Sequence, residues 1–252
     1  MNVTFLGTGT SQGVPVIACD CDVCQSEDPK DDRLRTSVLV QVDGKNLVID
    51  SGPDFRQQLL RENVKRLDGI LFTHSHRDHT AGLDDVRAFN FIQKQDIDVY
   101  ASEETQESLK NQFYYIFERK YPGVPRIVIH TIENEPFYID QTKIIPIQVT
   151  HLNLNVQCFR INDFTYVTDA NEISDEEKSK IKGSKVIVLN VLRKEEHVAH
   201  FNLEQGLALF EELKPEKGYI THISHQLGKH EDISKELPHN IELAYDGLQV
   251  SL

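Results

Sequence analysis

The segment T-H-S-H-R-D-H at residues 73–79 constrains this chain more than any other stretch, because three imidazoles and a carboxylate fall within six residues. It follows the apolar run G-I-L-F, which predicts a buried strand. His74 and His76 can point the same way from an extended segment, and Asp78 and His79 follow on the next turn. This layout fits two adjacent cations about 3.5–4 Å apart that share a bridging water or hydroxide.

Three further candidate metal ligands each follow an apolar-rich segment that predicts a strand: His151, Asp169 and His222. The strand that ends at Asp169, Y-V-T-D, resembles the strand L-V-I-D that ends at Asp50. Two similar halves that face each other would place both aspartates near one central cleft. No linker rich in Pro, Gly or Ser divides the chain, so we expect a single domain over residues 1–252.

The segment T-H-S-H-R-D-H-T-A-G-L with these downstream ligands resembles the metallo-β-lactamase-fold hydrolases. The resemblance implies an α+β fold, an αββα sandwich of two facing mixed sheets with helices outside. It also implies that Asp50 orients a ligand and does not bind metal itself, although a plain turn former is the alternative. The implied metal ligands are His74, His76 and His151 for one ion, Asp78, His79 and His222 for the other, and Asp169 as the bridge.

His200 lies in H-F-N-L-E-Q, just before a predicted helix that Asn202 caps with Gln205 at its third position. A loop before a helix is a place from which a side chain can reach a cleft. The residue resembles a histidine of the phosphodiesterase branch, which includes the tRNA 3′-end endonucleases. The resemblance implies that His200 is the general acid that protonates the departing alkoxide. His197 is the weaker candidate, and a surface-loop position is the alternative.

The glycine loop at residues 7–14, the stretch A-C-D-C-D-V-C, and the stretches around Arg35 and Arg87 resemble the phosphoribosyl 1,2-cyclic phosphate phosphodiesterases. Arginine suits a phosphate because its planar fork donates paired hydrogen bonds. For Arg87 an ion pair on a helix surface is the alternative. We therefore expect a dinuclear-metal-dependent phosphodiesterase of small, cyclic ribose phosphodiesters. A metal-bridging hydroxide would attack phosphorus, with His200 and the ligand Asp78 as catalytic residues.

The competing enzyme hypothesis is a tRNA 3′-end processing endoribonuclease similar to ribonuclease Z, or another metallo-hydrolase of the superfamily. The formal net charge of −13 disfavours nucleic acid as the main partner. The resemblance also implies a Gly/Pro-rich arm in the tRNA enzymes. The nearest segment here is residues 112–125, for which we expect a helix with a buried aromatic face and then a turn, or else a lid over a small substrate. A non-hydrolytic binding module is the hypothesis from another class.

The sequence shows no basic leader segment and no apolar run of about 18 residues, so we expect a cytoplasmic protein without a membrane partner. Imidazole and carboxylate ligands suit Zn²⁺, Mn²⁺ or Fe²⁺, and we expect two divalent ions, Zn or Mn, in the active site. The expected partner is a small phosphodiester substrate. A homodimer is common in the branch that the chain resembles.

Three cysteines at the spacing C-x-C-x-x-C, Cys19, Cys21 and Cys24, supply three thiolates where a structural zinc site needs four ligands. The candidates for the fourth ligand are Cys158, His197, His225 and His230. The resemblance to the cyclic-phosphate phosphodiesterases points to His225. It implies one structural zinc ion, because protein fills all four positions and leaves none for water. Three reduced cysteines without a metal are the alternative.

Overall fold

The computed structural model describes residues 1–118 and 122–252 of the chain. Two seven-stranded sheets form the centre of this described part. The first sheet contains, in spatial order, β14 (Gln249–Ser251), β1 (Asn2–Gly7), β2 (Ser37–Val42), β3 (Lys45–Ile49), β4 (Gly69–Leu71), β5 (Ile97–Ala101) and β6 (Ile127–Thr131). The second contains β13 (Ile241–Leu243), β12 (Lys217–Thr221), β11 (Val186–Asn190), β10 (Phe164–Tyr166), β9 (Leu154–Ile161), β8 (Thr142–His151) and β7 (Phe137–Ile139).

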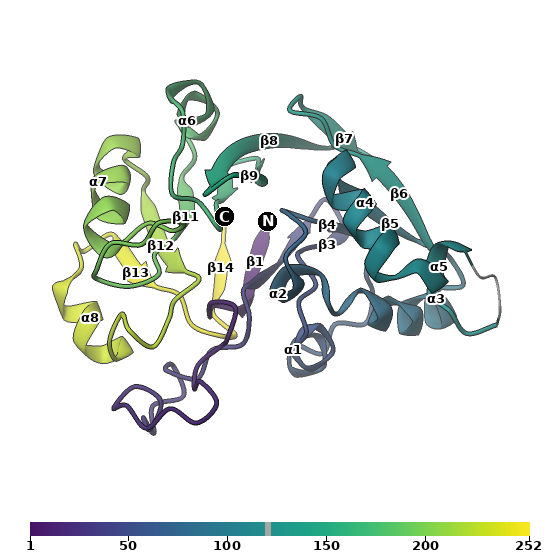
Figure 1. Cartoon of the computed structure of the whole chain (residues 1–252). Coiled ribbons are helices and arrows are strands. Elements are labelled where there is room, and N and C mark those ends of the chain that lie inside the picture. Colours follow the sequence, from purple (N-terminus) through teal and green to yellow (C-terminus); the bar gives the residue numbers. More distant parts are fainter. Residues whose placement is uncertain (119–121) are drawn as a thin grey trace.

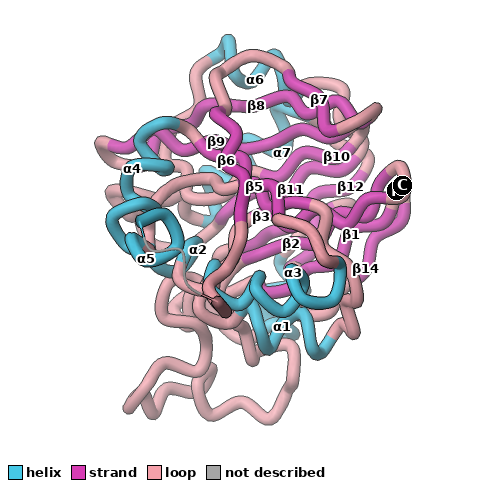
Figure 2. The backbone as a smooth tube through the Cα atoms, turned by 90° about the vertical axis from the view of Figure 1, so that its right-hand side faces the viewer, coloured by secondary structure: helices cyan, strands magenta, loops and turns pink. Residues whose placement is uncertain are grey.

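The two sheets share one pairing pattern. In the first, β3 to β6 are parallel and the strands from β14 to β3 are antiparallel. In the second, β10 to β13 are parallel and the strands from β7 to β10 are antiparallel. The pattern agrees with the expectation of two similar halves. Figure 2 shows that both chain termini lie together at one end of the strands, where β1 pairs with β14.

Three apolar clusters define four layers. The central cluster joins the facing sides of both sheets and includes Phe5 of β1, Phe159 of β9 and Tyr166 of β10. Burial of these large side chains stabilises the contact between the sheets. The outer side of the first sheet packs against α1 (Phe55–Arg61), the 3₁₀ helix η1 (Leu83–Val86), α3 (Arg87–Gln93) and α4 (Glu103–Gln112). The outer side of the second packs against α6 (Asp175–Ile181), α7 (Leu203–Leu213) and α8 (His230–Glu236).

Figure 1 shows these two groups of helices on opposite flanks of the sheets. The predicted αββα sandwich of two facing mixed sheets is confirmed. Two shorter helices are α2 (Arg77–Thr80) and α5 (Tyr114–Glu118). Among the described residues, no helix is both long enough and apolar enough to cross a membrane.

The N-terminal caps of α7 and α6 differ in how completely they form. α7 begins as expected, because Asn202 accepts a hydrogen bond from the Gln205 amide and the Gln205 side chain accepts one from the Asn202 amide. At α6, Ser174 accepts from the Glu177 amide, but Glu177 does not return the bond. Its carboxylate instead accepts from the amide of Gln148, at 2.9 Å, which ties α6 to β8. The spacing of Ser174 and Glu177 suits a reciprocal capping box, but only its first half forms at α6.

The prediction for residues 112–125 is confirmed in part, because Phe113 is buried and the partly buried Tyr115 and Phe117 pack against the apolar cluster on the outer side of the first sheet. The helix α4 ends at Gln112, and the separate short helix α5 follows with no fully buried side chain. The Tyr115 hydroxyl donates to Asp84, at 2.5 Å, so one aromatic side chain of the segment is held by a polar contact. Residues 119–121 of the segment lie outside the described residues.

Candidate metal centre

The carboxyl ends of parallel strands bring distant residues to one edge of the sandwich. Asp50 directly follows β3, His74 follows β4, Asp169 follows β10, and His222 directly follows β12. The backbone is left-handed at Asp50, Asp169 and His222, with φ of 64°, 52° and 57°. Non-glycine residues adopt this conformation at a cost in free energy, and such residues cluster at functional sites. Here the conformation turns three side chains from strand ends into the cleft.

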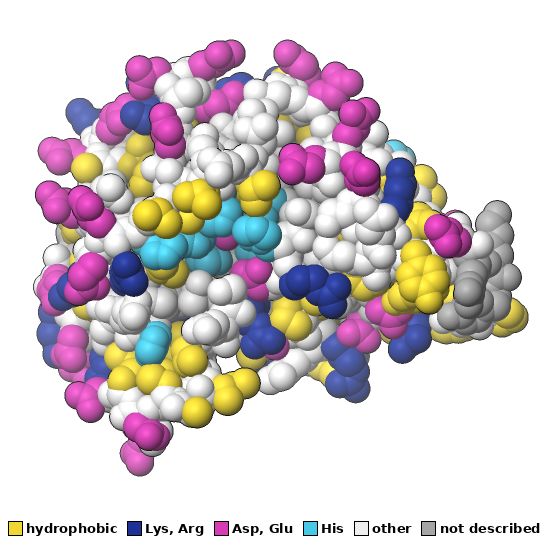
Figure 3. All heavy atoms as spheres, in the orientation of Figure 1, with side chains coloured by type: hydrophobic (Ala, Val, Ile, Leu, Met, Phe, Trp, Pro, Cys, Tyr) yellow, Lys and Arg dark blue, Asp and Glu magenta, His cyan; other side chains and the backbone are white. Residues whose placement is uncertain are grey.

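The seven predicted metal ligands gather in two groups, and in each group the ligand atoms lie within 4.8 Å of one another: His74, His76, His151 and Asp169 in one, and Asp78, His79 and His222 in the other. Figure 3 shows the histidine side chains collected in one patch on this face of the molecule. The structure therefore brings together every side chain that the sequence nominated for the dinuclear site.

Asp169 faces both groups with different oxygen atoms. Its Oδ2 lies 3.8 Å from His74 Nε2 and 3.9 Å from His151 Nε2. Its Oδ1 lies 3.3 Å from Nε2 of both His79 and His222. The carboxylate of Asp169 is thus placed to face both groups of candidate ligands.

The buried nitrogen atoms at the centre have no hydrogen-bond partner. Nε2 of His74, of His79 and of His222 is buried and unpaired in the described part of the chain. Buried polar atoms are nearly always paired, so each of these atoms requires an explanation. Imidazole nitrogens bind divalent metal ions once they give up their proton, and together with the carboxylates the cluster fits a dinuclear site.

A second set of contacts fixes the orientation of the imidazole rings. His79 Nδ1 donates to Asp50, at 2.7 Å, and His151 Nδ1 donates to the carbonyl oxygen of Ala199, also at 2.7 Å. Each contact places the proton on Nδ1 and leaves Nε2 free to face the site. Asp50 thus orients a candidate ligand, as its resemblance implied. Thr73 supports Asp50 by donating from both its amide and its hydroxyl, each at 2.8 Å.

Sequence reasoning missed the roles of Thr73 and Ala199. Thr73 directly precedes His74, so its position offered a signal, whereas nothing marked the backbone carbonyl of Ala199.

The charges of the buried groups are strongly coupled. Burial raises the pKa of Asp50 despite the neighbouring His79. Burial alone would lower the pKa of His79. The carboxylates of Asp169, Asp78 and Asp50 outweigh burial and keep that pKa well above the ordinary value. His222 and His79 outweigh burial at Asp169 and hold its pKa well below the usual range. Asp169 therefore stays ionised and gives the site negative charge that cations would neutralise.

His200 lies across both groups of candidate ligands. Its ring centroid is 4.6 Å from that of His151 and 4.7 Å from that of His222. Its Nδ1 is buried and unpaired among the described residues. Burial and the nearby His222 lower the pKa of His200 to about 3. The weaker candidate, His197, lies one ring further out, with its centroid 5.2 Å from that of His200.

A second cluster joins the N-terminal loop to the segment after β12. His225 Nδ1 lies 3.3 Å from the sulfur atoms of Cys19 and Cys21 and 3.5 Å from that of Cys24. One nitrogen carries at most one proton, so hydrogen bonding alone does not explain three short contacts. A tetrahedral zinc ion with ordinary bond lengths would separate S and N by about 3.6 Å, which these distances approach. The cluster therefore fits a zinc ion.

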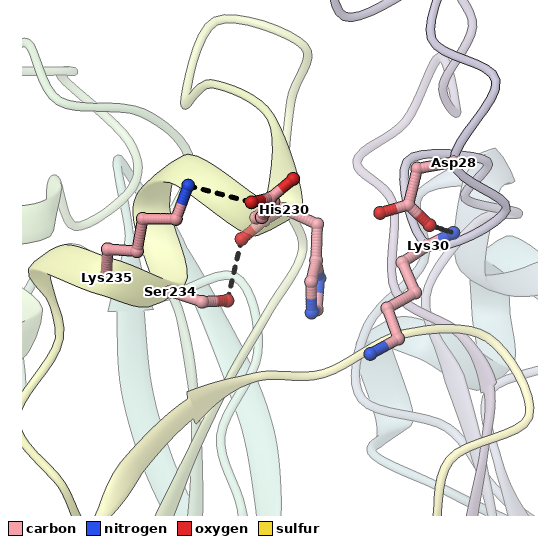
Figure 4. A pocket seen from close by; sticks show the side chains of 6 residues that line it. Asp28, Lys30, His230, Ser234 and Lys235 are labelled. Atoms are coloured by element: carbon pink, nitrogen blue, oxygen red, sulfur yellow. Dashed lines mark hydrogen bonds and ion pairs between the residues drawn. The ribbon is translucent and has the colours of Figure 1, made fainter.

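The other candidates for the fourth ligand lie elsewhere. Cys158 is fully buried in β9, donates toward the Thr168 carbonyl at 3.5 Å, and has a pKa raised by burial. His230 lines a separate hollow between α8 and the N-terminal loop (Figure 4), where its Nδ1 lies 3.2 Å from the Arg33 guanidinium. The sequence had left these alternatives open, and the geometry favours His225.

The side chains of Arg33, Arg35 and Arg87 make different polar contacts. Arg33 is buried and donates to the Thr8 hydroxyl, at 2.9 Å, and to a backbone carbonyl, so it supports the fold. Arg35 pairs with Asp54 at 3.2 Å. Arg87 pairs with Asp84 at 3.3 Å on an exposed surface, which is the alternative that the sequence had left open.

Comparison with known families decides the classification. The family model of the Beta-lactamase superfamily domain matches residues 45–223, which include all seven candidate ligands. The chain belongs to the beta-lactamase superfamily. The resemblance to metallo-β-lactamase-fold hydrolases is thereby confirmed, and with it the expectation of a metal-dependent hydrolase.

The proteins that this chain resembles carry different names. A crystal structure described as a new diphosphatase from the PhnP family is 40% identical, with a TM-score of 0.94 over 100% of this chain and 97% of that one. An octanoyltransferase of Porphyromonas gingivalis (strain ATCC BAA-308 / W83) is 35% identical over 99% of this chain and 51% of its own length. A ribonuclease Z of Bradyrhizobium diazoefficiens is 36% identical over 32% of this chain and 22% of its own length.

The chain thus spans about half the length, or less, of the curated relatives that it matches. About half of the octanoyltransferase lies outside the match, so the name of that longer protein assigns no activity to this chain.

Proposed function

We propose that the protein is a dinuclear-metal-dependent phosphodiesterase that hydrolyses a small phosphodiester, with a cyclic ribose phosphate as the first candidate. The observation that carries the proposal is the position of His200, whose ring lies between 4.6 and 4.7 Å from one candidate ligand of each metal group. A phosphate bound over both groups would therefore lie next to the imidazole of His200, which can donate or accept a proton. The similarity to a PhnP-family diphosphatase supports the same reaction class.

The residues of the chain have distinct tasks in this reaction. When bound, two divalent ions would supply a nucleophilic hydroxide at neutral pH and neutralise charge on the phosphoryl oxygens. Asp50 and the Ala199 carbonyl hold the rings of His79 and His151 in place. Asp78, whose Oδ2 lies 3.3 Å from His79 Nε2, completes its ligand group from the start of α2. The negative charge of a bound phosphodiester would raise the low pKa of His200, and the ring protonated in that complex would give its proton to the oxygen that leaves phosphorus.

The experiment compares His200→Ala on two substrates. An alkyl leaving oxygen needs a proton, whereas p-nitrophenolate leaves readily without one. We expect the variant to lose about 10²–10⁴-fold in kcat on a cyclic ribose phosphate and much less on bis(p-nitrophenyl) phosphate. Metal content per chain should stay at the wild-type value, and the exposed His239→Ala serves as the matched control. Equal losses on both substrates, or a loss of metal, would refute the general-acid assignment.

The second candidate is cleavage of precursor tRNA, which the local identity to a ribonuclease Z favours. The net charge of −13 weighs against it, because a polyanion binds through Lys and Arg. A direct comparison of precursor tRNA with cyclic phosphates as substrates of the Zn²⁺- or Mn²⁺-loaded protein separates the two. Metal binding without any turnover would favour a non-hydrolytic binding module.

The proposal includes a structural zinc ion held by Cys19, Cys21, Cys24 and His225. Protein atoms would fill all four positions, so this ion would stabilise and not react. It would tie the N-terminal loop to the segment that follows the candidate ligand His222. Measurement of metals per chain should then give up to three ions, one of which is zinc that resists exchange with Mn²⁺.

A further inference from the structure

The strand β6 forms an edge of the first sheet and lacks the features that usually protect such an edge. Its sequence, I-V-I-H-T, contains no lysine, arginine, acidic residue or proline. The other three sheet edges, β14, β13 and β7, are each three residues long, whereas β6 has five residues. Val128 is 43% exposed, and Figure 2 shows β6 on the side of the molecule that faces the viewer. An apolar edge of this kind pairs readily with another chain, because its outer backbone groups have no partner strand.

The hydrogen bonds to β5 determine which backbone groups of β6 point to the free side. The amide of Ile97 donates to the carbonyl of Arg126, at 3.0 Å, and the amide of Ile132 donates to the carbonyl of Ala101, at 2.9 Å. Even-numbered residues therefore pair with β5, because backbone groups alternate between the two sides of a strand. The residues that direct their amide and carbonyl groups to the free side are Ile127, Ile129 and Thr131. In the described part of the chain, no other element pairs with these groups.

We propose that β6 pairs antiparallel with β6 of a second copy of this chain, so that the first sheets of the two copies join into one continuous sheet. A two-fold axis places the same strand on both sides of the interface. With Ile129 opposite Ile129 of the second copy, Ile127 lies opposite Thr131, and every outward-facing amide and carbonyl of both strands gains a partner. Any other register leaves some of these groups without a partner within the strand.

The charged residues that flank β6 fit the same register. Arg126 precedes the strand, and its guanidinium lies toward α3, 3.5 Å from the Asn90 carbonyl. Glu133 is exposed and follows Ile132, which packs into the central cluster, so Glu133 turns to the side of the sheet on which α3 lies. Pairing about Ile129 places Arg126 of each copy opposite Ile132 of the other, one residue from Glu133. An arginine therefore meets a glutamate at both ends of the paired strands, and opposite charges favour this antiparallel arrangement.

Charge reversal tests the register by sedimentation velocity over a series of protein concentrations. The wild type should show a dimer fraction that rises with concentration. Glu133→Arg brings two arginines together at each end, and Arg126→Glu brings two glutamates together, so each variant should dimerise about tenfold more weakly. An equimolar mixture of the two variants should regain the wild-type affinity, because a mixed dimer has opposite charges at both ends. The control Glu211→Arg changes the net charge equally on α7, on the opposite flank, and should dimerise like the wild type.

A proline variant tests the hydrogen bonds between the strands. Ile129→Pro removes an amide hydrogen that points to the free side and leaves the bonds to β5 in place, which an edge strand tolerates. This variant should be monomeric at every concentration, with circular dichroism showing that it is folded; if it unfolds, the mixture of charge variants decides. A monomeric wild type, a dimer that neither the proline nor the charge reversals weaken, or a mixture that dimerises no better than its components would overturn the inference.

Discussion

The carboxylate of Asp50 offers the sharpest test of how the site is built. It accepts three hydrogen bonds, from the Thr73 amide at 2.8 Å, the Thr73 hydroxyl at 2.8 Å and His79 Nδ1 at 2.7 Å. Asp50→Asn preserves the shape of the side chain but replaces one oxygen by an amide nitrogen that only donates. At least one of the three donors must then face another donor, because Oδ1 accepts one of the bonds and Oδ2 accepts the other two. The amide oxygen can keep the Thr73 amide or the His79 ring, but not both in their present geometry. If that donor is His79, its ring loses the contact that keeps Nε2 free.

The expected loss appears mainly in metal affinity. Removal of a contact that orients a ligand costs about 10–100-fold, which equals about 1.4–2.7 kcal/mol. A hydrogen bond to a charged group contributes about 1.5–3 kcal/mol to stability. Burial also raises the pKa of Asp50, so the ionised carboxylate is itself costly to bury. A neutral amide avoids that cost, and the free energy of unfolding of the metal-free protein should fall by less than the hydrogen bond alone would suggest.

The assay is a chelator competition that measures Zn²⁺ affinity, paired with urea unfolding of the metal-free protein. Asp54→Asn is the matched control, because Asp54 accepts from the Arg35 amide at 2.8 Å and lies outside the histidine cluster. Wild-type affinity in Asp50→Asn would show that Asp50 does not orient His79. Equal losses of affinity in both variants would show a general effect of removing a carboxylate.

Two further predictions concern the zinc cluster and the hollow of Figure 4. His225→Ala should lower bound zinc by one per chain and lower the midpoint of thermal unfolding, whereas Cys158→Ala should retain the zinc; the reverse result would contradict the assignment. Burial and the Arg33 guanidinium lower the pKa of His230 to about 4, whereas the unfolded chain titrates near 6.5. The unfolded state alone therefore takes up this proton as pH falls from 6.5 to 4, and stability is lost in that window. The loss should be less than about 1.4 kcal/mol per pH unit, because solvent screens the ring. The free energy of unfolding of His230→Asn, measured by urea unfolding at each pH, should fall less steeply with pH over this window.

The sequence predicted the parts of the site that depend on local spacing. T-H-S-H-R-D-H places its ligands within one strand end and one short helix, α2, so their proximity follows from the chain itself. The strands before Asp50 and His74 were visible as apolar runs, and the parallel pairing of β3 with β4 brings their ends together. The start of helix α7 was predicted correctly, because Asn202 and Gln205 form the expected cap.

The contacts that orient the ligands were not predictable in the same way. His151 and Ala199 are 48 residues apart, and a backbone carbonyl carries no signature in the sequence. Glu177 has the residue type and spacing of a capping box, but the unpaired amide of Gln148 on β8 competes for its carboxylate. The tertiary partner decided the outcome, and only the packed structure reveals that partner.

Left-handed backbone at non-glycine residues connects the fold to the site. Asp50, Asp169 and His222 have positive φ at the ends of strands in both sheets, and Leu152 has it in the β8–β9 turn. In each case glycine would suit the backbone better, yet glycine has no side chain to place in the cleft. The left-handed backbone at these positions costs some stability, and it directs the side chain away from the path that an extended strand would give it. Three of these side chains belong to the metal centre and its support. The conformation alone assigns no function to the fourth, because turn residues outside the histidine cluster, such as Asp43 and Asn162, have it as well.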